Sequence, residues 1–168
     1  DKMAQIRQAM PGFITIKSDG SLNYGLEINT APATLAIHRE KWKGFLSGDP
    51  SLLDGLTSHD SETCGMHVHL SSVGLTAPGL LSMIRFMNSN SNASWLKSLA
   101  RRDSSQWAAR RELGGANIFS AIGNNLMSTR YNALNILPGS TVEFRLFKGT
   151  LVYETLMRRI EAVEGLRQ

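Results

Sequence analysis

The stretch NALNILPGSTVEFRLF, residues 132–147, constrains the fold more than any other part of the chain. Two runs of strand-forming residues flank Pro138-Gly139-Ser140, a combination that is typical of a tight turn. The two strands of such a hairpin pair antiparallel. We therefore expect an antiparallel sheet at the centre of the fold.

The other strands and helices follow from the spacing of apolar residues. Strands are expected at 13–17, 24–29 and 66–72, with Asp19-Gly20-Ser21 as a turn between the first two. Helices are expected at 35–46, 78–87, 96–99, 106–113 and 153–166. The predicted fold class is α+β, an antiparallel sheet with helices packed on one face.

Composition limits the class of protein. The 168 residues suffice for a single domain, and 42% hydrophobic with 19% charged residues is typical of a soluble globular protein. No apolar run is long enough to span a bilayer, and one cysteine calls for no oxidising compartment, so a cytoplasmic protein without membrane contact is expected. A net charge of +4 suits small anions such as nucleotides better than nucleic acid. Because the sequence begins at Asp1, we expect that it is a piece of a longer chain.

Three of the predicted strands have ionisable residues on the face opposite their apolar one. Side chains alternate between the two faces of a strand, so His67 and His69 share a face of their strand. In the same way, Glu143 and Arg145 share a face of a second strand. Glu27 lies on the face of a third strand that is opposite its apolar neighbours. If the three strands pair in one sheet, these five side chains converge. Carboxylates and imidazoles bind divalent cations, here Mg²⁺ or Mn²⁺, and arginine binds carboxylate or phosphate oxygens. The pattern indicates a site for a phosphoryl group.

Plainer interpretations stay open. Each histidine fits a half-buried structural role, and Glu143 with Arg145 fits a solvated face or an ion pair. A zinc site made of Cys64, His67 and His69, completed by Glu27 or Glu143, is also conceivable. Regular alternation points Cys64 to the opposite face unless Gly65 breaks it, which ranks zinc below magnesium.

Two motifs resemble one known superfamily. CGMHVHLS, residues 64–71, resembles the histidine segment of glutamine synthetases, and VEFRLFKGTL, residues 142–151, resembles a late strand of that superfamily. The order DGS…GLE, GMHVH, STRYNALN, TVEFRLF-GTL is similar to that of the amidoligase family, a group of glutamine synthetase-like carboxylate–amine ligases. The resemblance covers roughly residues 13 to 165.

The resemblance implies one domain over residues 1–168 with a glutamine synthetase catalytic-domain-like fold. It implies an ATP-dependent ligase that phosphorylates a carboxylate at Mg²⁺ or Mn²⁺ ions and then forms an amide with an amine. The partners would be those substrates, whether small molecules, peptides or protein side chains. By position, the resemblance implies that Glu27, His67 and Glu143 are metal ligands. It implies that His69, Arg130 and Ser21 bind the nucleotide cofactor. It implies catalytic roles for Arg145, Arg130 and Glu143.

One departure from the family bears on activity. Amidoligases open with a strand of the form G-x-E-x-E, and nothing before Phe13 resembles it. The alternative to a ligase is therefore a catalytically inactive binding protein on the same scaffold, for example a phage accessory factor. The basic segment 101–113 is interpreted as the solvated face of a helix, with a nucleotide or nucleic-acid groove that uses Trp107 as the second interpretation.

Overall fold

A computed structural model of the chain describes residues 2–20, 22, 25–61, 63–111, 113 and 127–167. The chain divides into two compact units, Asp1–Cys64 with Gly149–Ile160 and Gly65–Lys148 with Glu161–Gln168, which we call unit 1 and unit 2. No helix in the described part of the chain combines the length and the apolar character needed to cross a lipid bilayer.

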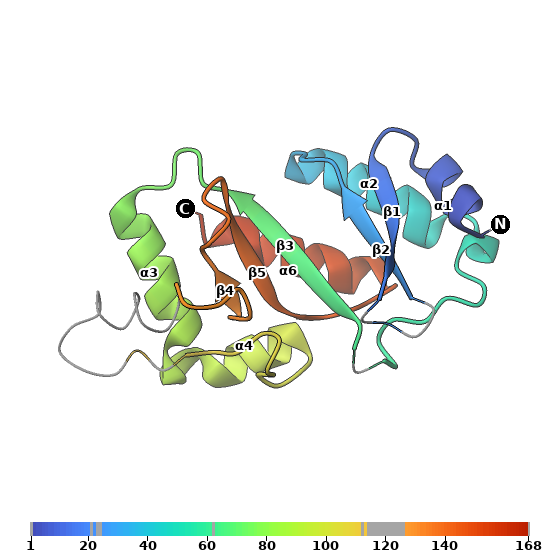
Figure 1. Ribbon diagram of the computed structural model, residues 1–168. Coiled ribbons are helices and arrows are strands. Elements are labelled where there is room, and N and C mark those ends of the chain that lie inside the picture. The colour runs from blue at the N-terminus through green and yellow to red at the C-terminus, as the bar shows by residue number, and fades with distance from the viewer. Residues whose placement is uncertain are drawn as a thin grey trace. The chain divides into compact units, whose positions relative to one another are not determined.

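Unit 1 contains the first sheet. Strands β1 (Ile14–Asp19) and β2 (Gly25–Thr30) pair antiparallel, as the turn composition between them predicts. Helix α1 (Lys2–Ala9) precedes this sheet and α2 (Leu35–Ser47) follows it (Figure 1).

Unit 2 contains the second sheet, with strand order β3-β5-β4. Its strands β3 (Gly65–Ser71), β4 (Leu134–Asn135) and β5 (Thr141–Lys148) are antiparallel neighbours. The hairpin expected around residues 138–140 is confirmed, and Gly139 takes a φ of +69° that favours glycine in the turn. Helices α3 (Ala77–Asn88) and α4 (Ala93–Ala100) lie between β3 and β4 in the sequence. The closing helix α6 (Tyr153–Gly165) begins in unit 1 and ends in unit 2.

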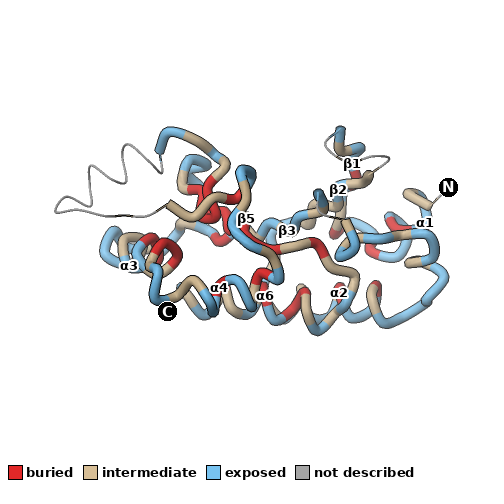
Figure 2. The backbone as a smooth tube through the Cα atoms, turned by 90° about the horizontal axis from the view of Figure 1, so that it is seen from below, coloured by how far each residue is buried: buried red, intermediate tan, exposed pale blue. Residues whose placement is uncertain are grey.

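The core of unit 2 forms where α3, α4 and the end of α6 meet the apolar side of the sheet, and buried segments appear in red along α3 and near β5 in Figure 2. A β-bulge in β5 pairs Met66 with Phe147 and Val68 with Phe144, so the two phenylalanines both reach the core although they are three positions apart. The buried residues of this cluster include Leu70, Met83, Ile84, Met87, Leu96, Leu134, Val142, Phe144, Leu146, Phe147 and Val163.

Two features differ from the sequence-based expectations. The α+β class and the antiparallel pairing are confirmed, but the strands form two sheets rather than one. The helix expected at 106–113 is wrong, because residues 105–111 are extended or turned. Ala109 N–H donates to the carbonyl of Tyr131 and Ala133 N–H donates to the carbonyl of Ala109, at 2.9 and 2.8 Å. Hydrogen bonds to a distant segment thus replace those of a helix.

The N-cap of α3 provides a first test of this architecture. Thr76 Oγ1 accepts a hydrogen bond from the backbone N–H of Gly79 at 3.1 Å. Replacing Thr76 with alanine removes this acceptor and is expected to lower the free energy of unfolding by about 1 kcal/mol, measured by urea denaturation. Thr76→Ser, which keeps the hydroxyl, is the control. Equal stabilities of the two variants would contradict a capping role.

Candidate functional site

The alternation predicted for β3 is confirmed. Leu70 is buried in the core of unit 2, whereas His67 and His69 are exposed on the other face. His69 lies directly opposite Glu143 in the β3–β5 register. Directly opposed residues of antiparallel strands share a face, so the two imidazoles and this carboxyl group lie together.

Glu143 is the centre of the resulting cluster. Its side chain is only 8% exposed. Oε1 accepts a hydrogen bond from Nη1 of Arg145 at 2.7 Å, and it lies 3.2 Å from Nδ1 of His67 and 3.6 Å from Nε2 of His69. Oε2 accepts a hydrogen bond from Nδ2 of Asn135 at 2.7 Å. Both oxygens of this buried charge are therefore paired, as burial requires.

The surroundings keep Glu143 ionised. Burial is the largest single influence on the pKa of its carboxyl group and raises it, but hydrogen bonds from His67 and Asn135 and the charge of Arg145 together lower the pKa from 4.5 to about 2. When His67 donates to this carboxylate, its proton sits on Nδ1. Nε2 of His67 is then the nitrogen left to contact a ligand.

Arg145 is positioned by the bulge in β5 and by its neighbours. Its side chain is 14% exposed, and Nε donates to the backbone oxygen of Trp107 at 3.4 Å. The carbonyls of Arg145 and Leu146 accept hydrogen bonds from the guanidinium of Arg102 at 2.6 and 2.9 Å. Burial, and then the charge of Arg145, lower the pKa of Arg102.

Arg130 lies at the outer part of the same cluster. Its Cζ lies 5.1 Å from the ring centroid of Tyr131, and Nη2 donates to the Tyr131 hydroxyl at 3.2 Å. The hydrogen bond with Tyr131 is the main cause that raises the pKa of Arg130, and the charge of Glu143 acts in the same direction. The Cζ atom of Arg145 lies 5.9 Å from the centroid of the same Tyr131 ring. Unit 2 thus brings together His67, His69, Arg130, Glu143 and Arg145, which are five of the residues named from the sequence.

Glu27, another of the named residues, belongs to unit 1. The expectation that Glu27 shares a sheet with the histidines is wrong, because β2 pairs only with β1 in the described part of the chain. Glu27 is exposed and lies directly opposite Lys17 in the β1–β2 register, which suits a cross-strand pair of opposite charges. Ser21 lies outside the described residues.

The metal assignments stay predictions. Among the described residues, no group of three or more His, Cys, Asp or Glu side chains is placed to hold a metal ion. In unit 2, Oε1 of Glu143 is used by Arg145 and His67, but Oε2 accepts one hydrogen bond and keeps a lone pair. Mg²⁺ keeps several waters and needs only one or two protein carboxylates when it binds with phosphates, so these donors are of the right kind. The magnesium set of Glu27, His67 and Glu143 and the zinc set with Cys64 both remain hypotheses.

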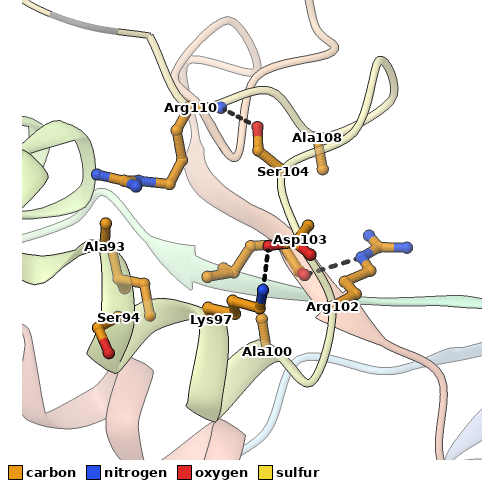
Figure 3. Close-up of a pocket in the computed structure, with 11 residues that line it drawn as sticks. Ala93, Ser94, Lys97, Ala100, Arg102, Asp103, Ser104, Ala108 and Arg110 are labelled. Atoms are coloured by element: carbon orange, nitrogen blue, oxygen red, sulfur yellow. Dashed lines mark hydrogen bonds and ion pairs between the residues drawn. The ribbon is translucent and has the colours of Figure 1, made fainter.

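A hollow of about 280 Å³ beside α4 is a weaker candidate site (Figure 3). Lys97 in its wall pairs with Asp103 at 2.8 Å. Arg110 donates to the carbonyls of Met87 and Ser89 at 3.0 and 2.6 Å. Lys97 and Arg110 already have partners within the protein, so fewer donors in this hollow are free to bind a ligand than in the cluster around Glu143.

Two contributors to the cluster have no role in the sequence-based interpretation. Asn135 lies directly opposite Glu143 across the predicted hairpin, so an assumed hairpin register would have found it. No sequence pattern would have identified Arg102, because it reaches β5 from a loop that is distant in the chain. No family model, curated protein or solved structure matches this chain.

Proposed function

We propose that this chain is an ATP-dependent carboxylate–amine ligase of the glutamine synthetase-like kind, with Mg²⁺ or Mn²⁺ as cofactor. One observation carries the proposal: His67, His69 and Arg145 surround the ionised carboxylate of Glu143 on one face of a sheet. Guanidinium and imidazole donors held in fixed positions are what a transferring phosphoryl group requires.

The proposed reaction has two steps. A carboxylate oxygen of the substrate takes the γ-phosphoryl group of ATP, which gives an acyl phosphate and ADP. The nitrogen of the amine then attacks the carbonyl carbon, the carbon–oxygen bond to phosphate breaks, and the amine loses a proton. Glu143 and His67 are the residues of unit 2 that would hold Mg²⁺, and the ion would supply positive charge that neutralises phosphate.

The residues of unit 2 have defined roles in this scheme. Arg145 binds the substrate carboxylate and then the acyl phosphate through the N–H groups that Glu143 and Trp107 leave open. Glu143 orients Arg145 and His67 through the contacts at 2.7 and 3.2 Å. Arg130, which is exposed, contacts a phosphate oxygen of the nucleotide.

ADP release tests the proposal. The full chain is incubated with ATP, Mg²⁺, ammonium chloride and a mixture of amino acids and dicarboxylates, and ADP is measured with and without each component. His67→Ala and Glu143→Gln are expected to lower the rate by about 100-fold or more. His59→Ala, an exposed histidine that pairs with Asp60, is the matched control and keeps the rate. Unchanged activity in both site variants would refute the assignment.

A second candidate is nucleotide binding without turnover. It is favoured by the pairing of both Glu143 oxygens with Arg145 and Asn135, which leaves little of this carboxylate for a metal. Calorimetry separates the two functions. ATP binding that is independent of Mg²⁺, with no ADP formed, supports binding alone.

A further inference from the structure

The backbone around Trp107 is hydrogen-bonded to neighbouring segments of unit 2, whereas its side chain faces solvent. It is 57% exposed, although large aromatic side chains are usually well buried. Its loop is fixed by the hydrogen bond from Ala109 to Tyr131, and its own backbone oxygen accepts from Arg145 at 3.4 Å. An open indole on an anchored backbone is a preformed surface for a planar ligand.

The neighbours of Trp107 are aromatic and cationic. Its ring packs against Tyr131 with centroids 5.1 Å apart and planes at 79°. Arg130 lies 5.1 Å from the same Tyr131 ring, so the indole and this guanidinium are within about 10 Å of each other. An exposed indole and an exposed guanidinium thus both contact the same tyrosine ring.

The charge around this surface suits an anion. Arg130 and Arg145 both face Tyr131, and the nearby carboxylate of Glu143 is already paired with Arg145 and Asn135. A ligand that joins an aromatic ring to phosphate would satisfy both the indole and the exposed guanidinium.

We propose that Trp107, Tyr131 and Arg130 form a nucleotide-binding surface, in which the base stacks on Trp107 and a phosphate oxygen binds Arg130. This inference rests on the proposed function, because it assigns the two ends of the nucleotide to residues of the same site. It assigns to Trp107 a role in ligand binding that the helix interpretation of residues 106–113 did not favour.

Trp95 offers a matched control for Trp107. It is 49% exposed and packs edge-on against Phe86 at 5.6 Å and 75°, so it is also an exposed indole that contacts one aromatic ring. Calorimetry on the full chain, supported by tryptophan fluorescence, compares three probes: ATP, inorganic tripolyphosphate and a single-stranded oligonucleotide of about ten nucleotides.

The expected results distinguish base from phosphate. Trp107→Ala weakens ATP binding about tenfold, abolishes most of the fluorescence quenching by ATP and leaves tripolyphosphate binding unchanged. Trp107→Phe restores most of the ATP affinity, and Trp95→Ala changes neither ligand. Arg130→Ala weakens ATP and tripolyphosphate alike, whereas Arg85→Ala, which removes an exposed cation from α3, does not.

Three results would overturn the inference. If Trp107→Ala binds ATP as tightly as the unmodified chain does, Trp107 does not stack on the base. The ligase proposal would then still be tested separately by ADP release. Tripolyphosphate that binds as tightly as ATP would exclude a base contact. An oligonucleotide that binds more tightly than ATP, with strong salt dependence, would reassign the surface to nucleic acid. Trp107-dependent ATP binding with no ADP release would instead refute the ligase and keep the surface.

Discussion

Replacing Glu143 with glutamine is expected to lower the free energy of unfolding by about 3–5 kcal/mol. The amide cannot accept on its nitrogen, so at least one partner among Arg145, His67 and Asn135 loses its acceptor in a largely buried setting. Urea denaturation followed by circular dichroism measures the change. Glu40→Gln is the control and should shift stability by less than about 0.5 kcal/mol, because Glu40 is exposed and pairs only with Lys41 at 3.3 Å.

A double-mutant cycle separates this pair from its surroundings. In Glu143→Gln with Arg145→Met, no charge is left unpaired at this position, so the loss of stability should be smaller than the sum of the two single losses. A double variant whose loss equals that sum would show that Glu143 and Arg145 do not interact energetically, contrary to the 2.7 Å contact.

Acid should remove the same stabilisation. The pKa of Glu143 is lowered in the folded chain from 4.5 to about 2, so its contribution is fully present above the unfolded value of 4.5 and is lost as pH falls through the folded value of about 2. The shift corresponds to about 3 kcal/mol. Because glutamine does not titrate, the stability difference between the unmodified chain and Glu143→Gln should shrink by this amount between pH 6 and about pH 2.

Glutamine isolates the contribution of this carboxyl group, because it has nearly the same shape as glutamate and no ionisable proton. A difference in unfolding free energy that stays constant with pH would show that Glu143 is not held by these partners.

Local patterns were sufficient for most strands and helices. Apolar spacing predicted α2, α3, α4 and α6, and turn chemistry predicted the hairpin of β4 and β5. The composition of residues 106–113 suits a helix, but Ala109 and Arg111 form hydrogen bonds with Tyr131, Asn132 and Asn88 of unit 2 instead. Intrinsic helix propensity is a weak preference, and contacts with distant residues override it.

For the candidate site as well, part was predictable from local sequence patterns and part depended on which strands pair. Alternation alone placed His67 with His69 and Glu143 with Arg145, because side chains two positions apart share a face of any strand. The strand that carries Glu27 shows the same alternation but pairs in another sheet. Alternation says which face a residue takes and nothing about which strand lies beside it.

The amino-acid sequence by itself determined the α+β class, the hairpin and the paired histidines, since each follows from the period of a helix or strand and from turn chemistry. Only the tertiary structure decided that β3 lies beside β5 and brings both histidines to Glu143, that Arg102 reaches β5, and that Trp107 stands open next to Tyr131. These contacts join residues far apart in the chain or depend on strand register, and both are set by burial of the apolar face and by the bulge in β5.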